Sequence, residues 1–312
     1  VIGGDKKSRD KLWSTDVQYY IANYELLLHD FNEIKKLKLD AIIADEATRI
    51  SNPKNKTTRA IKKLEAKFKL PLTGTPLNNS VQDIWSLIDF CEPGALGSYY
   101  QFVDKYCEKD TWGSIKGYKN LDKLKEEIEP YVVRRLKSEV LTQLPPKLYE
   151  NVYLDFSPEE IEMYKAVQAG VASELKELGM TARGGLQNIM TKMLRFKQAT
   201  GSLELISSST KSSKVDATKE LCEILCAGDG KVIIFTFFKQ MALILMRELA
   251  QYNPLLIAGG VSQEERVERR NLFNQKNDNK VLIMTDAGAF GLNLQEQAQS
   301  VIHYDLPWSI TK

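Results

Sequence analysis

The 312-residue sequence contains only four cysteines and two histidines. Four cysteines in a chain of this length do not make a disulfide framework, which favours a reducing compartment. Cys222 and Cys226 are four residues apart and could share one helical face, but no histidine or third cysteine lies near them. They are therefore interpreted as buried core thiols. His29 and His303 are isolated and provide no basis for a histidine-based metal centre or catalytic triad.

An excess of charge of one sign is also missing. The 43 basic and 41 acidic residues leave a net charge of +2, which excludes a uniformly basic nucleic-acid binder but permits local basic patches. Long apolar runs are absent too. Stretches such as Val232-Ile233-Ile234-Phe235 are far too short to span a bilayer, so no membrane partner is expected. The first residues resemble neither a signal peptide nor an initiator sequence, and we interpret this start as an internal cut.

The length of 312 residues suggests about two domains of ordinary size, and a hydrophobic fraction of 43% is enough for the chain to bury cores. Strands and helices alternate over residues 231–304, which predicts a parallel sheet and an α/β fold. Further strands are predicted at 17–22, 37–45, 68–72 and 149–156. We expect a first domain at 1–150 with a helical protrusion at about 91–130. A second is expected at 151–312, with a helical protrusion at about 157–210 and a serine-rich linker at about 203–213.

Two adjacent acids, Asp45 and Glu46, follow an apolar run that ends at Ala44. In parallel α/β sheets, ligands bind at the carboxyl ends of the strands. Paired carboxylates at such an end suit a Mg²⁺–nucleotide site, in which one acid holds the metal through water and the other activates the attacking water. Taken alone, the pair is equally compatible with an acidic turn or a helix N-terminus.

A second strand end supports the nucleotide site. The string Thr-Gly-Thr-Pro at 73–76 combines two hydroxyls, an exposed backbone amide and a proline with a fixed φ. If its strand lies beside the first, we expect Thr73 and Thr75 to hydrogen-bond Asp45 and Glu46 and to sense whether a γ-phosphate is present. A threonine-capped turn would explain one hydroxyl but not the whole string.

In this order, the segments resemble the SNF2-like branch of the superfamily 2 helicase-type ATPases, and the resemblance covers nearly the whole chain. The matching stretches are Asp45–Thr48 (motif II), Leu72–Asn79 (motif III), Val133–Lys137 with Leu144–Lys147 (the branch-specific segment between the lobes), Phe235–Met241 (motif IV), Gly259–Asn274 (the signature that follows it), Thr285–Leu294 (motif V) and Asp305–Trp308 (the lead into motif VI).

The sequence departs from the family pattern in three places. It contains no G-x-x-x-x-G-K-[ST] P-loop, so the phosphate cradle and its lysine are missing. Motif VI, which carries arginines that would reach the γ-phosphate, should begin just after Trp308. Thr48 stands where the family usually has a histidine, which affects the link between the acids and motif III. We therefore interpret the chain as a fragment of a longer ATPase and expect it to hydrolyse essentially no ATP alone.

The resemblance implies two RecA-like lobes of the P-loop NTPase type, both incomplete here, with ATP and Mg²⁺ in the cleft. It implies that double-stranded DNA lies across both lobes and that ATP hydrolysis drives the enzyme along the duplex, remodelling DNA or protein–DNA complexes. By motif, Asp45 would hold Mg²⁺ through water and Glu46 would activate the hydrolytic water. The residues implied to couple ATP state to DNA grip are Thr73, Gly74 and Thr75, and those implied to reach the ATP cleft from the second lobe are Asp286, Gly288, Gly291 and Asn293.

The same motifs indicate where DNA would be held, since phosphate contacts position a protein without reading sequence. Arg134 and Arg135 are expected to serve the interlobe hinge or cleft. The DNA-contact candidates, each of which could equally be a structural loop residue, are Arg49, Asn52, Phe237, Lys239, Gly259 and Ser262.

Two other functions stay open. One is an RNA or strand-separating helicase of the same superfamily, against which the Arg-Arg segment and the long helical insertions argue. The other is a non-catalytic DNA-binding scaffold that kept the fold and lost its P-loop. The segment from motif V toward motif VI resembles bacterial, archaeal and phage members, so a cytoplasmic location is expected, with a nuclear one as the alternative.

Overall fold

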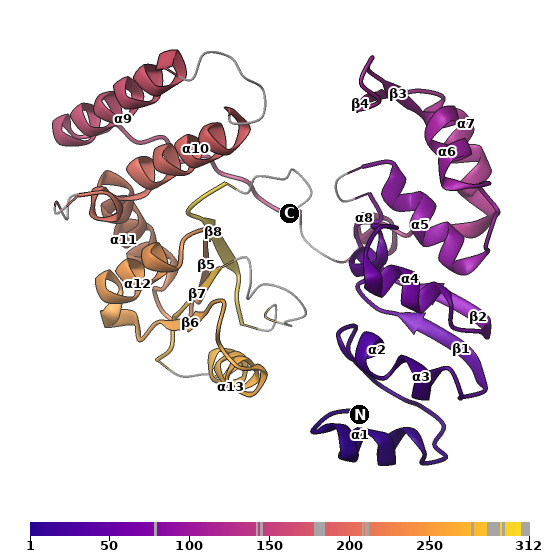
Figure 1. Ribbon diagram of the computed structural model, residues 1–312. Coiled ribbons are helices and arrows are strands. Elements are labelled where there is room, and N and C mark those ends of the chain that lie inside the picture. The colour runs from indigo at the N-terminus through magenta and orange to yellow at the C-terminus, as the bar shows by residue number, and fades with distance from the viewer. Residues whose placement is uncertain are drawn as a thin grey trace. The chain divides into compact units, whose positions relative to one another are not determined.

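The computed structural model describes residues 1–77, 80–141, 143, 146–177, 185–207, 209, 212–275, 278–285, 294 and 297–306 (Figure 1). The chain divides into two compact units, Val1–Lys147 and Leu148–Ile310, and each is described by itself. Within the described residues, no helix combines the length and the apolar character needed to cross a membrane.

The first unit is built on a two-stranded parallel sheet. Strand β1 pairs with β2 in a register that places Leu39 opposite Ala66 and Ala44 opposite Pro71. The elements of this unit are α1 (Lys6–Trp13), α2 (Leu26–His29), α3 (Phe31–Ile34), β1 (Leu39–Ala44), the 3₁₀ turn η1 (Ala47–Ile50), α4 (Lys56–Lys62), β2 (Ala66–Pro71), α5 (Gln82–Cys91), α6 (Tyr99–Tyr106), β3 (Cys107–Lys109), β4 (Ile115–Tyr118), α7 (Leu121–Ile128), η2 (Glu129–Tyr131) and α8 (Lys137–Val140).

Only one face of this sheet is covered by the described part of the chain. Side chains alternate between the two faces of a strand, and those facing the helices include Ala44, which is 2% exposed. On the opposite face, Ile43, Phe68 and Leu70 are 62%, 55% and 49% exposed. Because the faces of parallel sheets are normally both buried, this apolar face is an unusual feature of the unit.

Helix α5 joins the sheet to the segment that follows it. Apart from Asp89 and Cys91, all of its side chains are buried, which is typical of a central helix. Leu87 and Phe90 pack into the core beneath the sheet. Ile84, Trp85 and Ile88 pack into a separate core with α6 and α7.

The protrusion expected to be helical over 91–130 contains α6 and α7, but an antiparallel hairpin, β3–β4, lies between them. The helical expectation was therefore wrong for residues 107–118. The physical reason is local turn chemistry, because Asp110 and Gly113, whose φ is +80°, close a tight reversal that a helix cannot accommodate.

Two predicted strands are also absent from the structure. Residues 17–22 and 149–156 alternate as strands do, but neither segment belongs to a sheet in the described part of the chain. Side chains of both segments are largely in solvent, since Tyr19 is 76% exposed and Tyr153 is 90% exposed. The carbonyl of Ile21 accepts the N–H of Ile2 at 2.7 Å, but a single hydrogen bond does not make the ladder that a strand requires.

The second unit contains a four-stranded, all-parallel sheet in the order β6–β7–β5–β8. Its elements are α9 (Pro158–Glu177), α10 (Gly185–Gly201), η3 (Leu203–Leu205), α11 (Ser213–Leu225), β5 (Val232–Thr236), α12 (Lys239–Glu248), η4 (Ala250–Tyr252), β6 (Leu255–Ile257), α13 (Gln263–Asn274), β7 (Val281–Thr285) and β8 (Ser300–His303).

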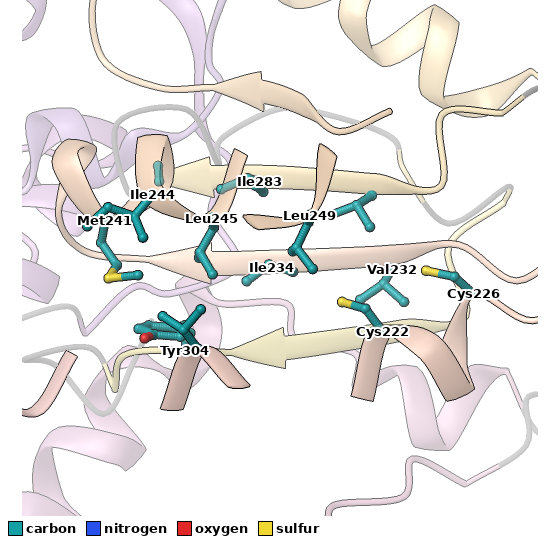
Figure 2. Packing of buried hydrophobic residues seen from close by; sticks show 13 residues of the cluster. Cys222, Cys226, Val232, Ile234, Met241, Ile244, Leu245, Leu249, Ile283 and Tyr304 are labelled. Carbon is teal, nitrogen blue, oxygen red and sulfur yellow. The ribbon is translucent and has the colours of Figure 1, made fainter. Parts of the chain in front are cut away.

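Both faces of this sheet are covered, as expected for an α/β fold. On one face, Ile234 and Ile283 pack against Leu245 and Leu249 of α12 and against Cys222 of α11 (Figure 2). On the other face, the alternate residues of the strands pack against α13 through Phe273, which is fully buried. Cys222 of α11 and Cys226, which caps its C-terminus, are buried core thiols, as predicted.

The described ends of the serine-rich stretch at about 203–213 pack into the second unit. Leu203 is 2% exposed, and Ser212 caps α11 while its hydroxyl donates to the carbonyl of Gly201 at 3.0 Å. At Ser212 the serine therefore has a structural role as a helix cap.

Candidate nucleotide site and DNA-contact residues

The two acids lie where the sequence placed them, directly after β1. Glu46 adopts φ 49° and ψ 51°, a left-handed conformation that non-glycine residues rarely take and that is often found at functional sites. The Oδ1 atom of Asp45 accepts the N–H of Glu46 at 3.0 Å, and both side chains are exposed. The sharp turn thus presents two adjacent carboxylates at the carboxyl edge of the sheet.

The turn rests on a buried base. Ala47 and Ile50 of η1 are fully buried, and the hydroxyl of Ser86 in α5 donates to the carbonyl of Ile50 at 2.8 Å. Ser86 is itself fully buried, so this hydrogen bond is shielded from water. Helix α5 therefore holds the segment that follows the acids.

The end of β2 lies beside the acids, which is the condition on which the expected threonine contacts depended. The N–H of Leu72 donates to the carbonyl of Ala44 at 2.8 Å, and the N–H of Ala47 donates to the carbonyl of Leu72 at 2.9 Å. These two hydrogen bonds continue the parallel ladder beyond the strands and bracket Asp45 and Glu46. Motifs II and III thus meet at one edge through their backbones.

The predicted hydrogen bonds from the threonine side chains to the acids were wrong. The hydroxyl of Thr73 instead accepts the N–H of Thr75 at 3.1 Å, closing a turn around Gly74. No hydrogen bond between these threonines and Asp45 or Glu46 is found in the described part of the chain. A hydroxyl two residues before a free N–H has a closer partner in its own turn.

Sequence reasoning missed Tyr24. Its hydroxyl donates to the backbone carbonyl of Asp45 at 2.6 Å, which helps to fix the backbone of the first acid. Burial, assisted by the charge of Asp45, raises the pKa of Tyr24 to about 12, so the hydroxyl stays protonated. The two residues are far apart in sequence, and no local pattern signals the contact.

Two DNA-contact candidates near the acids have partners within the first unit. Arg49 forms an exposed ion pair with Glu25 at 3.3 Å. The Oδ1 atom of Asn52 accepts the N–H of Lys54 at 2.9 Å, which is the role of a turn residue. Arg134 and Arg135 are exposed in an irregular segment before α8.

At the carboxyl edge of the second sheet, Asp305 is a further residue that the sequence reasoning left without a role. Its Oδ2 atom accepts the hydroxyl of Thr236 at 2.7 Å and the N–H of Phe237 at 3.0 Å. The Asp305 side chain is 5% exposed, and the Nζ atom of Lys214 lies 4.0 Å away. Burial lowers the pKa of Lys214, and the charge of Asp305 opposes this shift.

Asp305 therefore ties the end of β8 to the end of β5, where motif IV begins. The ring of Phe237 also lies 5.2 Å from the Nζ atom of Lys197 in α10. The candidate Lys239 is exposed at the first position of α12. This edge gathers a backbone turn, an aromatic ring and lysines in one place.

The remaining second-unit candidates follow β6. Ser262 caps α13 in a reciprocal box with Glu265, with hydrogen bonds of 3.1 Å in both directions. Gly259 lies between β6 and this cap, next to Gly260, whose φ is +91°. The predicted cleft residues Asp286, Gly288, Gly291 and Asn293 lie outside the described residues.

Comparison with known proteins decides the family. The SNF2-related domain matches residues 1–205, and the helicase conserved C-terminal domain matches residues 213–312. The chain belongs to the SNF2-related family. The resemblance derived from the motifs is thereby confirmed, as is the α/β fold with parallel-sheet lobes.

Similar proteins come from bacteria and eukaryotes. An uncharacterized ATP-dependent helicase of Mycoplasma genitalium is 29% identical over 312 residues, covering 98% of this chain and 29% of that protein. The human SWI/SNF-related matrix-associated actin-dependent regulator of chromatin subfamily A member 1 is 28% identical over 328 residues, covering 98% of this chain and 31% of that protein. The chain thus spans about a third of the length of these relatives.

Among solved structures, the Sulfolobus solfataricus SWI2/SNF2 ATPase core in complex with dsDNA is similar to this chain. It is 32% identical, with 90% of this chain and 61% of that chain covered and a TM-score of 0.47.

Proposed function

We propose that this SNF2-related chain forms part of an ATP-dependent motor that moves along double-stranded DNA and remodels DNA or protein–DNA complexes. The observation that carries the proposal is the pair Asp45 and Glu46, presented by a left-handed turn at the carboxyl edge of a parallel sheet and bracketed by the end of β2. Family membership supports the assignment of this edge to nucleotide chemistry.

The two acids are suited to a Mg²⁺–ATP site. Carboxylate oxygens are preferred Mg²⁺ ligands, and a site with few protein ligands keeps water and nucleotide phosphates around the ion. One oxygen of Asp45 is engaged by the N–H of Glu46, and the side chain is open to solvent, which suits contact through water. When bound, Mg²⁺ would neutralise phosphate charge. Glu46 orients the attacking water and accepts its proton.

The end of β2 passes the state of this edge to the rest of the first unit. Because Leu72 is bonded to Ala44 and Ala47 through its backbone, a shift of the acids moves Thr73, Gly74 and Thr75 with it. This route replaces direct contact between threonine hydroxyls and the acids. Asp286, Gly288, Gly291 and Asn293 are proposed to complete the ATP site, with Arg134 and Arg135 acting between the lobes.

DNA is proposed to be held by backbone and side-chain groups at the strand ends. In the second unit these are Phe237, Lys239, Gly259 and Ser262, and in the first Arg49 and Asn52, with Arg49 exchanging its Glu25 partner for a phosphate. We propose that the protein is located where its DNA substrate is. In an organism without a nucleus, that location is the cytoplasm.

The test uses the full-length parent protein, assayed for ATP hydrolysis with and without duplex DNA. We expect Glu46→Gln to lower the DNA-stimulated rate by about 100-fold or more, the usual contribution of a general base, while nucleotide binding is retained. Asp40→Asn is the matched control, because Asp40 is an exposed acid in β1, at the end of the strand remote from Glu46. Unchanged hydrolysis by Glu46→Gln, or equal stimulation by single-stranded RNA, would refute the proposal.

A further inference from the structure

The hairpin β3–β4 carries an unexplained tryptophan at its tip. Trp112 is 90% exposed, so almost the whole indole ring lies in water. Tryptophan is usually buried over most of its surface, and an exposed one is typical of a contact with a partner. Trp13 and Trp85, by contrast, are 5% and 8% exposed in the cores of the same unit.

The exposure of Trp112 is imposed by the turn that carries it. The Oδ1 atom of Asp110 accepts the N–H groups of Trp112 at 2.9 Å and Ser114 at 2.8 Å. The N–H of Asp110 also donates to the carbonyl of Ser114 at 2.8 Å, and Gly113 takes a left-handed φ of +80°. These hydrogen bonds define the backbone at the tip and direct the indole away from the unit.

The base of the hairpin is equally well anchored. Tyr106, at the end of α6, is fully buried, and its hydroxyl donates to Glu127 of α7 at 2.6 Å. The carbonyl of Tyr106 accepts the N–H of Lys119 at 3.0 Å, which closes the hairpin. The base of the hairpin is therefore anchored to the core that α6 and α7 share with α5.

The hairpin also carries exposed lysines. Residues 105–119 contain four lysines and the two acids Glu108 and Asp110, and the carboxylate of Asp110 accepts hydrogen bonds within the turn. Lys105 and Lys109 are paired with Glu127 and Asp104. The exposed lysines left over, which form no ion pair within the described part of the chain, are Lys116 and Lys119.

We propose that the β3–β4 hairpin is a second duplex-DNA contact, outside the ATP cleft. Lys116 and Lys119 bind backbone phosphates, and the indole of Trp112 packs into the adjacent groove against the sugar edges. The combination of free lysines and one rigid aromatic ring matches the chemistry of DNA, which offers dense negative charge and apolar surfaces in its grooves. This inference rests on the proposed function, because it assumes that duplex DNA is the substrate.

The test uses the full-length parent protein and a 40-base-pair duplex, with acrylamide quenching of tryptophan fluorescence as a direct readout. In the wild type, we expect the duplex to shield the most accessible emission, and in Trp112→Phe this component and its shielding are both lost. Trp112→Ala should raise the Kd for duplex about tenfold. Lys116→Gln with Lys119→Gln should reduce the slope of log affinity against log salt by about 2, since each phosphate contact contributes about 0.9.

Tyr100→Ala provides the matched control, because Tyr100 is 83% exposed at the other end of α6 and should leave the Kd unchanged. The proposal is overturned if Trp112 remains open to acrylamide with duplex bound and Trp112→Ala binds within twofold of the wild type. It is also overturned if Trp112 is shielded before duplex is added, because another protein surface then covers the hairpin. If the wild type binds no duplex, the proposed function itself fails.

Discussion

Because Glu46 adopts a left-handed backbone conformation, we expect this residue to lower the stability of the first unit while it is required for ATP hydrolysis. An L-residue other than glycine loses about 1–2 kcal/mol in this backbone region. Glu46→Ala keeps that strain, whereas Glu46→Gly removes it but adds chain entropy to the unfolded state, which costs about 0.4–1 kcal/mol. We therefore expect the glycine variant to be more stable than the alanine variant by about 1 kcal/mol.

The control is a position at which the glycine variant should be less stable than the alanine variant. Asp40 lies in extended strand backbone, where glycine is less stable than alanine by about 0.5–1 kcal/mol. We expect Asp40→Gly to be less stable than Asp40→Ala, the opposite order to that at Glu46. Both positions are exposed acids near the two ends of β1, so charge and burial are similar.

Urea unfolding followed by the fluorescence of the buried Trp13 and Trp85 reports on the first unit. A difference of about 1 kcal/mol shifts the urea midpoint by about 0.5 M for a unit of this size. All four variants are measured in the same buffer, and both Glu46 variants should lack ATP turnover. If glycine and alanine at position 46 unfold at the same midpoint, the backbone there is unstrained and the reasoning is refuted.

Three further perturbations test buried polar contacts in the two units. Ser86→Ala should destabilise the first unit by about 1–3 kcal/mol, because the buried carbonyl of Ile50 loses its donor, and a urea midpoint equal to the wild type would contradict this. The Arg9 guanidinium holds the pKa of the Asp30 carboxyl below its usual range, so the unfolded chain takes up the proton first as pH falls. Stability present above about pH 4 is therefore lost as pH drops through the lowered folded pKa, and Asp30→Asn should flatten this dependence in urea midpoints measured from pH 2 to 7. Glu160→Gln should weaken the second unit by about 2 kcal/mol, because this buried carboxylate accepts hydrogen bonds at the starts of both α9 and α11. Faster hydrogen exchange in α11 would show the effect, and unchanged exchange would count against it.

Much of the second unit could be predicted because its signals are local. The alternation of short apolar strands with helices indicated the parallel sheet, and at the start of α9 the cap is formed by Ser157 and Glu160, two residues only three positions apart. Predictions of this kind succeed because each depends on residues within one or two turns of chain.

The failures share one physical cause. Residues 17–22 have the alternation of a strand, but a strand forms only where a neighbour accepts its hydrogen bonds. The hydroxyl of Thr73 in motif III had two candidate partners, the acids and the N–H of Thr75, and it binds the N–H, which is closer in sequence. The spacing of these residues does not predict either outcome.

Neighbouring residues alone show that two carboxylates follow an apolar strand and that a Thr-Gly-Thr-Pro string follows another. The folded chain is needed to show that Leu72 brackets the acids, that Tyr24 holds Asp45 and that Asp305 ties β8 to β5. Each of these contacts joins segments about 20 or more residues apart. Such contacts depend on which distant segments the fold brings together, and the spacing of neighbouring residues does not specify that.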